Sequence, residues 1–304
     1  MIQLNVANET SRLKAVVLGI AQSNGPTPTP AACYDPSSLM HVKDGTYPLE
    51  PQMLKELSAL EAVFKRYNVT VFRPHIIPDC NQIFARDVAF VIEDKIIKSN
   101  ILPDRENEFS AMSHILEQID SRKIIELPEE CHIEGGDVIL FNDYLFAGVY
   151  TGPDYSDFIT ARTNQKAIDA LKSLFPHKTL KTFELKKSNT EPQENALHLD
   201  CCFQPIGQGK ALIHKAGFLN PLDCQFLEDL FGKENLFQAS KTEVAAMNCN
   251  VFSISEDVVV SEQNFIRLNQ WLRLQGFIVE EVAYSEISKQ GGLFRCSTMP
   301  LIRT

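Results

Sequence analysis

The sequence predicts an α/β protein built from a repeated unit, and two observations lead to this class. First, a short apolar strand, a polar turn and a second apolar strand recur at a spacing of about 45 to 65 residues. Second, amphipathic helical segments separate these strand pairs. Repeats at this spacing are typical of ring-like or stacked architectures, so we expect the units to form one structure rather than two unrelated domains.

The strand pairs can be located from their apolar segments and polar turns. Four of them are DVAFVIEDKIIKSN from Asp87, GDVILFNDYLFAGVY from Gly136, LDCCFQPIGQGKALIHK from Leu199 and NVFSISEDVVVS from Asn250. A fifth pair can be assembled from LKAVVLG near the N-terminus and GLFRCSTMPLIR near the C-terminus, if these two segments meet. The sequence therefore predicts five strand pairs, one of which joins the first and last segments.

Two of the intervening segments have a clear helical pattern. The segment from Glu50 to Tyr67 carries Pro51 in its first turn, where proline is well tolerated. Its apolar residues recur at helical spacing: Leu54, Leu57, Leu60, Val63 and Phe64. A second helix is expected from Asn264 to Gln275, with one apolar stripe formed by Phe265, Leu268, Trp271 and Leu272.

A ring of such units would have its helices outside and its strand ends facing a central axis. One polar residue at the equivalent place in each unit would then converge on a common pocket. An ordinary mixed α/β sheet is the alternative that the strand pattern alone leaves open. With the ring we expect a single catalytic domain over residues 1–304.

Composition narrows the class of protein and of partner. The chain of 304 residues is 44% hydrophobic and 22% charged, which is typical of a globular protein. Its formal net charge of -10 argues against a broad nucleic-acid surface, since such surfaces depend on clustered Lys and Arg. We expect no membrane span and no secretory signal, and therefore a cytoplasmic protein whose eight cysteines are reduced.

Polar residues stand at the entrance of each predicted strand pair, where an unpaired buried polar group would cost free energy. They are Asn81, Arg86, Asp87, Glu134, Asp137, His198, Asp200 and Cys296. Cys296 follows two glycines and is the candidate nucleophile, His198 is a candidate base, and Glu134 is a carboxylate suited to orienting an imidazole. Each of these three, taken alone, is more often structural than catalytic, so their strength as candidates comes from their shared position.

A metal or nucleotide site is the rival explanation for such residues. The chain has no CxxC, HxxxH or HExxH spacing that would predict a zinc site. It also has no GxxxxGK or GxGxxG motif for a nucleotide cofactor. We therefore expect neither a metal nor a cofactor.

Five segments in register resemble the guanidine-modifying superfamily, which holds arginine deiminases, dimethylarginine dimethylaminohydrolases and amidinotransferases. They are NQIFARD at Asn81, HIEGGD at His132, ARTN at Ala161, LHLD at Leu197 and GGLFRCSTMPLIR at Gly291. The resemblance implies a fivefold pseudosymmetric α/β propeller of the pentein type and a small guanidino substrate such as arginine. It also implies a covalent thiouronium intermediate and no cofactor.

The resemblance also implies roles for individual residues. Cys296 matches the nucleophile, His198 the general acid and base, and Glu134 the carboxylate paired with that histidine.

A second set of matched residues concerns substrate binding. Asp87 and Asp200 match the carboxylates that bind the substrate guanidinium, whereas Asn81, Arg105 and Arg162 match groups that bind its α-carboxylate. The sequence alone leaves open whether Asp87 or Asp137 faces the pocket. The resemblance assigns this place to Asp87, so Asp137 is expected to support the residues that bind the substrate.

Two enzyme classes and one non-enzymatic alternative remain open at this point. The segment around Arg86 and Asp87 resembles arginine deiminases, and Arg295 stands where amidinotransferases often have His. Asp200 favours an unmethylated guanidinium, because a methylated nitrogen offers it fewer N–H groups. The segment LHLDCCFQPIGQG also resembles amidinotransferases, and the chain lacks room for the helical module usual in deiminases. Hydrolysis of an arginine-like compound is the favoured prediction, with amidino transfer second and an inactive arginine sensor third.

Overall fold

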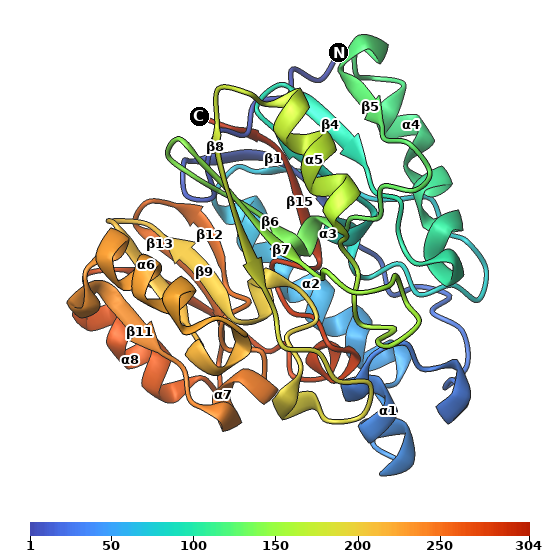
Figure 1. Ribbon diagram of the computed structural model, residues 1–304. Coiled ribbons are helices and arrows are strands. Elements are labelled where there is room, and N and C mark those ends of the chain that lie inside the picture. The colour runs from blue at the N-terminus through green and yellow to red at the C-terminus, as the bar shows by residue number, and fades with distance from the viewer.

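Five three-stranded sheets make up the structure, a computed structural model that describes residues 1–304 (Figure 1). In each sheet the central strand pairs antiparallel with one neighbour and parallel with the other. The antiparallel partners are the predicted strand pairs. The repeated unit is therefore a strand pair, a connecting segment and a third strand parallel to the second.

The five sheets follow one another along the chain, and the first is completed by the last strand. Their strands are β15 (Thr298–Arg303), β1 (Leu13–Leu18) and β2 (Thr70–Phe72); β3 (Ala89–Ile92), β4 (Lys95–Lys98) and β5 (Ile124–Glu126); β6 (Val138–Phe141), β7 (Tyr144–Val149) and β8 (Thr179–Glu184); β9 (Phe203–Ile206), β10 (Lys210–Ile213) and β11 (Leu236–Gln238); and β12 (Phe252–Ser255), β13 (Val258–Glu262) and β14 (Ile278–Val282).

The two ends of the chain meet in one sheet. Strand β1 pairs antiparallel with β15, from Leu13 opposite Arg303 to Leu18 opposite Thr298. This confirms the fifth predicted strand pair, for which no local turn exists in the sequence. It also closes the repeat, so the fivefold propeller class is confirmed and the single mixed sheet is wrong.

Helices lie outside the sheets. The longer ones are α1 (Pro36–Lys43), α2 (Glu50–Arg66), α5 (Gln165–Leu174), α6 (Pro221–Phe231) and α8 (Ile266–Leu274), and short helical turns are α3 (Ala85–Val88), α4 (Ser113–Leu116) and α7 (Lys241–Ala245). Helix α2 buries four of its five predicted apolar residues, Leu57, Leu60, Val63 and Phe64. The fifth, Leu54, is 37% exposed, and Met53, which was not predicted, is buried beside it. Helix α8 is shorter at both ends than expected, because Phe265 and Gln275 have non-helical backbone angles and cap the helix.

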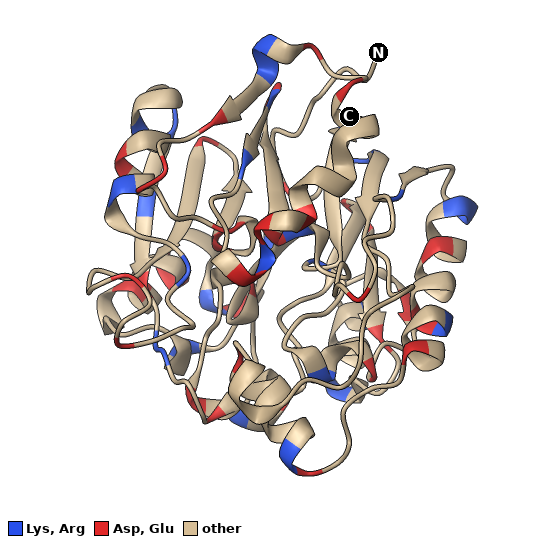
Figure 2. Ribbon diagram, turned by 90° about the vertical axis from the view of Figure 1, so that its right-hand side faces the viewer, with Lys and Arg blue, Asp and Glu red and all other residues tan.

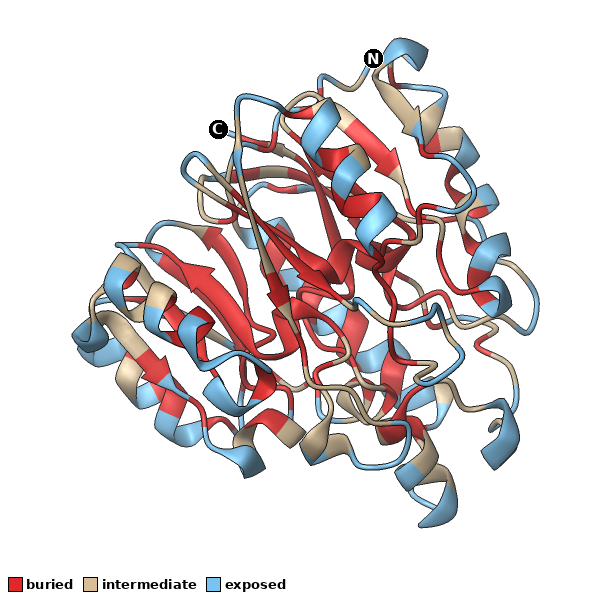
Figure 3. Ribbon diagram, in the orientation of Figure 1, coloured by how far each residue is buried: buried red, intermediate tan, exposed pale blue.

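Burial follows the same division between sheets and helices. In Figure 3 the central strands are mostly buried, whereas each outer helix is exposed on the side that faces away from them. Packing of the α2 apolar face therefore stabilises the outer layer, and truncating Leu57 to Ala would cost about 2–5 kcal/mol.

A tight buried turn precedes the first strand of each sheet. Three of these turns are α3, the 3-10 helix η4 (Gly135–Asp137) and the 3-10 helix η6 (Leu199–Cys201). The other two span residues 246–249, shortly before β12, and 294–297, directly before β15. Turn α3 contacts both η4 and β15, and η4 contacts η6. The turns therefore converge, although they are far apart in the sequence.

Charged residues are dispersed over the outside of the molecule. On the side shown in Figure 2, Lys and Arg alternate with Asp and Glu along the outer helices. None of the helices combines the length and the apolar character needed to cross a bilayer.

Candidate active site

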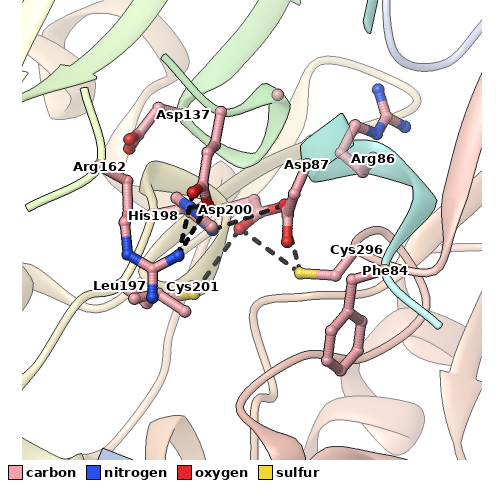
Figure 4. A network of polar contacts seen from close by, with 12 residues as sticks. Phe84, Arg86, Asp87, Asp137, Arg162, Leu197, His198, Asp200, Cys201 and Cys296 are labelled. Atoms are coloured by element: carbon pink, nitrogen blue, oxygen red, sulfur yellow. Dashed lines mark hydrogen bonds and ion pairs between the residues drawn. The ribbon is translucent and has the colours of Figure 1, made fainter. Parts of the chain in front are cut away.

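Cys296 lies in the buried turn before β15, and only 2% of it is exposed. Two glycines bring the chain to this turn. Gly291 has a left-handed φ of +77°, and a Cβ on Gly292 would lie 2.4 Å from the ring of Phe84. The Cys296 sulfur lies 3.7 Å from Oδ2 and 4.0 Å from Oδ1 of Asp200 (Figure 4).

His198 and Glu134 form a buried pair beside this turn. Nε2 of His198 lies 2.8 Å from Oε2 of Glu134, whose oxygens also accept from Nη1 of Arg162 at 3.0 and 3.1 Å. Burial lowers the pKa of His198, but the carboxylates of Asp87 and Glu134 outweigh it and raise that pKa to about 9. Burial raises the pKa of Glu134, but Arg162 and His198 lower it far below its usual range. The pair is therefore an imidazolium and a carboxylate at neutral pH.

The glycines of HIEGGD have a steric reason to be there. A Cβ on Gly136 would lie 2.5 Å from Nδ1 of His198, and a Cβ on Gly135 would lie 2.2 Å from the carbonyl oxygen of Arg86. Neither gap admits a methyl group. The two glycines let η4 approach both α3 and the imidazole ring.

Asp87 and Asp200 are each held by one arginine. Oδ2 of Asp87 accepts from Nη1 of Arg105 at 2.9 Å, and Oδ2 of Asp200 accepts from Nη1 of Arg295 at 2.9 Å. Oδ1 of Asp87 is buried and has no hydrogen-bond donor from the protein. Nδ1 of His198 also has no such partner and lies 3.8 Å from that oxygen. Unpaired polar atoms are therefore concentrated where the turns converge.

The same carboxylates disfavour a free thiolate. Burial and the nearby carboxylates of Asp200 and Asp87 raise the pKa of the Cys296 thiol well above its usual value. Burial likewise raises the pKa of Asp87, although His198 and Arg105 oppose the shift. A cation bound between the carboxylates would relieve both effects.

The three residues predicted to bind an α-carboxylate lie around this centre. Arg105 donates to Oδ2 of Asp87 at 2.9 Å and to the two carboxylate oxygens of Glu108 at 2.7 and 3.0 Å. Arg162 donates Nη2 to the carbonyl oxygen of Tyr34 at 2.7 Å, besides its bonds to Glu134. These contacts show that both arginines hold internal carboxylates, so their role toward a substrate carboxylate stays a prediction.

Asn81 stands at the edge of a cavity. Its Nδ2 donates to Gln290 at 2.7 Å. The cavity of about 220 Å³ is lined by Asn81 and Arg105, together with Tyr34, Tyr47 and Glu108 among others. It reaches the outer side of Arg105, next to the buried centre. Its role in binding a substrate also stays a prediction.

Asp137 is bonded through both oxygens. Oδ1 accepts from the backbone N–H of Leu199 at 2.9 Å, and Oδ2 accepts from Oγ1 of Thr163 at 2.7 Å. It therefore fixes η6, which carries Asp200. The expectation that Cys201 and Cys202 belong to a strand is wrong, because they close this turn ahead of β9.

Sequence reasoning missed several residues of the centre. Glu9 and Glu108 pair with Arg295 and Arg105. Asn250 donates Nδ2 to the Cys296 sulfur at 3.2 Å. Asn250 could have been found, because it precedes its strand pair just as Asp87 and Asp200 precede theirs.

Ligand atoms of Asp87, Glu134 and His198 lie within 4.8 Å of one another, which is close enough to consider a metal ion. Both Glu134 oxygens, however, already bind the Arg162 guanidinium, and one also binds His198. A divalent cation would meet that positive charge. The donor set fits an organic cation that interacts with Asp87 and Asp200 better than a metal.

Comparison with known proteins places this arrangement in a family. Residues 48–303 match the family model described as N,N dimethylarginine dimethylhydrolase, eukaryotic. The uncharacterized protein YkgA of Bacillus subtilis is 31% identical over 225 residues, which cover 73% of this chain and 70% of YkgA. An arginine deiminase of Bacillus cereus is 26% identical, over 74% of this chain and 62% of the deiminase, so the chain spans less than two thirds of that relative.

Solved structures agree on the fold. The N-terminal domain of ArgZ, an arginine dihydrolase from cyanobacteria, superposes with a TM-score of 0.77 at 18% identity, covering 95% of this chain and 97% of that domain. The inosamine-phosphate amidinotransferase StrB1 of Streptomyces griseus gives 0.75 at 18% identity, covering 100% and 98%. With the matched family model, these findings show that the chain belongs to the N,N-dimethylarginine dimethylhydrolase family of the guanidine-modifying pentein superfamily.

Proposed function

We propose that this protein is a cysteine-dependent hydrolase that cleaves a guanidino C–N bond of free arginine or a substituted arginine. The observation that carries the proposal is the position of Asp200 and Asp87 beside the Cys296 sulfur and of His198 beside Asp87, with one Asp87 oxygen and one imidazole nitrogen left without a protein partner. A guanidinium offers forked N–H groups to two carboxylates and places its central carbon between them.

Binding of the substrate cation prepares the nucleophile. Asp87 and Asp200 bind the guanidinium N–H groups, and its positive charge lowers the pKa of the Cys296 thiol from its raised value. The thiol proton then leaves to solvent. The resulting thiolate attacks the guanidino carbon, which forms a C–S bond.

His198 supplies the proton that the leaving amine needs. Its imidazolium is the acid form below a pKa of about 9, so it protonates the leaving amine as the C–N bond breaks. The product at this stage is a thiouronium on Cys296, with a neutral imidazole beside it. Glu134 holds the ring by its 2.8 Å contact to Nε2.

Water completes the reaction. The neutral His198 takes a proton from water, the hydroxide adds to the thiouronium carbon, and the C–S bond breaks to release the thiolate. The hydroxyl proton of the product then passes to this thiolate, which restores the thiol beside the imidazolium. The products are a ureido compound and ammonia, or an alkylamine where the substrate nitrogen is substituted. Arg105, Arg162 and Asn81 bind the α-carboxylate of the substrate.

Amidino transfer is the second candidate, because LHLDCCFQPIGQG around His198 also resembles amidinotransferases. In that reaction an acceptor amine replaces water at the thiouronium. An arginine sensor without turnover is the non-enzymatic alternative.

Product analysis separates these candidates. The protein is incubated with arginine or with asymmetric dimethylarginine, each with and without glycine as an amine acceptor. Citrulline with ammonia from arginine, or with dimethylamine from its dimethyl derivative, is expected without acceptor. Strict dependence on the acceptor would establish transfer instead, and binding without any product would favour the sensor.

The covalent step has its own test. Intact mass after rapid acid quench is expected to show a thiouronium adduct on the wild type and none on Cys296→Ala. Full turnover by Cys296→Ala would contradict the mechanism. Cys224→Ala is the control, since this cysteine lies on the outer helix α6.

A further inference from the structure

Asn250 lies just after the turn 246–249, immediately before the segment that leads into β12, and is fully buried. Its place corresponds to that of Asp87, Asp200 and Cys296, each of which lies in the turn before the first strand of its sheet. The fold therefore directs the side chain of Asn250 toward the same centre.

The amide of Asn250 has a defined orientation. Oδ1 accepts from the backbone N–H groups of Arg295 at 3.0 Å and Cys296 at 3.2 Å. Nδ2 donates to the carbonyl oxygen of Asp200 at 3.4 Å and to the sulfur of Cys296 at 3.2 Å. Because a backbone N–H can only donate and a carbonyl can only accept, the alternative amide orientation would lose all three backbone contacts. The N–H group must therefore face the sulfur.

No other side chain donates a hydrogen bond to this sulfur. The titratable and charged groups that face it are Asp87 of α3, Asp200 and Cys201 of η6, Tyr284 after β14, and Arg295 of its own turn. Arg295 directs its guanidinium to Glu9 and Asp200 instead of the sulfur. A thiolate at this place has two carboxylates as neighbours, and Asn250 is the one side chain that donates to it, besides the backbone N–H of Leu293.

We propose that Asn250 is a further catalytic residue, whose Nδ2–H donates to the Cys296 thiolate. The bond stabilises the anion before it attacks and again when the C–S bond breaks. This inference rests on the proposed function for its chemical meaning. The two ends of the amide have different roles. Oδ1 stabilises the turn by accepting from two backbone N–H groups, and Nδ2 donates to the reacting sulfur.

The substitution Asn250→Asp tests the role of Nδ2 separately from that of Oδ1. The carboxylate keeps an acceptor for the N–H groups of Arg295 and Cys296, but it turns an oxygen toward the sulfur and the Asp200 carbonyl. The probe is iodoacetamide, which the thiolate alkylates with loss of iodide. Labelling of the peptide that contains Cys296 is followed by mass spectrometry across a range of pH. This measurement does not depend on turnover, so it stands even if the proposed function fails.

Asn248→Asp is the matched control. It makes the same substitution two residues away, on a buried side chain for which no hydrogen bond exists, at the edge of a cavity of about 350 Å³. We expect Asn250→Asp to slow alkylation of Cys296 at least tenfold at fixed pH and to move the midpoint of the pH profile up by about one unit or more. Equal profiles for the two variants would overturn the proposal.

Asn250→Ser covers the case in which Asn250→Asp does not fold. Serine is neutral and too short to reach the sulfur from the same backbone position. Its profile is expected to move upward by less than that of the aspartate variant, while its thermal unfolding shows a folded protein. A folded serine variant with the wild-type midpoint would overturn the proposal on its own.

Discussion

The two carboxylates beside Cys296 are held in the same way but in different surroundings. Asp87 and Asp200 each accept from an arginine at 2.9 Å. Arg295, which holds Asp200, is 0% exposed and is enclosed by Glu9 and the carbonyl oxygen of Val138. Arg105, which holds Asp87, lines the cavity of about 220 Å³. The same arginine–carboxylate pair therefore occurs twice in the fold, once fully enclosed by protein and once beside a cavity.

Loss of Arg295 is expected to have the largest effect on stability. Arg295→Met leaves Glu9 and Asp200 buried without their cation, so the free energy of unfolding should fall by about 3–5 kcal/mol. Arg105→Met should cost about 1–3 kcal/mol, because the cavity admits water to Glu108 and because burial has already raised the pKa of that carboxyl. Urea unfolding of both variants measures these losses of unfolding free energy. Equal losses would contradict the expected difference between the enclosed Arg295 and the cavity-lining Arg105.

The pH dependence of the free energy of unfolding tests the ion pair between Glu9 and Arg295. Burial raises the pKa of Glu9, but Arg295 and Arg86 outweigh it and lower the pKa from 4.5 to about 2. A carboxyl group whose pKa is lower in the folded than in the unfolded protein stabilises the fold at a pH above its unfolded-state pKa. This stability is lost as the pH falls toward the folded-state pKa. This shift corresponds to about 3 kcal/mol. Between pH 5 and 2, wild-type stability should therefore fall more steeply than that of Arg295→Met.

Local patterns were enough to predict the repeat and the converging polar residues. Strand pairs, glycines and pre-strand polar groups all lie within short segments, so their positions followed from the sequence. The ion pairs did not, because Glu9 and Arg295 are 286 residues apart and no pattern connects them. The apolar character of LDCCF predicts a strand. In the fold, Asp137 binds the N–H of Leu199 and makes the segment a turn instead.

A change at Glu134 tests the histidine side of the centre. Glu134→Gln removes a carboxylate that raises the pKa of His198 to about 9. The acid form of His198 exists below its pKa, so wild-type kcat/KM should fall as the pH rises through about 9, and the variant should lose activity at lower pH. Initial rates across the pH range measure the shift. Glu93→Gln is the control, because it changes the partner of the exposed His177 in the same way, and its profile should match the wild type.

Arg162 offers the smallest and most specific contrast. Its Nη1 holds Glu134, so Arg162→Ala should lower kcat for every guanidino substrate by the same factor. If Arg162 also binds an α-carboxylate, KM should rise about tenfold or more for arginine but little for agmatine, which lacks that anion. Because the Glu134 effect is common to both substrates, the ratio of their KM changes isolates carboxylate binding. Arg122→Ala, at an exposed arginine paired with Asp120, should change neither value. An equal rise in KM for arginine and agmatine would show that Arg162 serves the scaffold alone, as Arg295 does, because its guanidinium would then only hold an internal carboxylate.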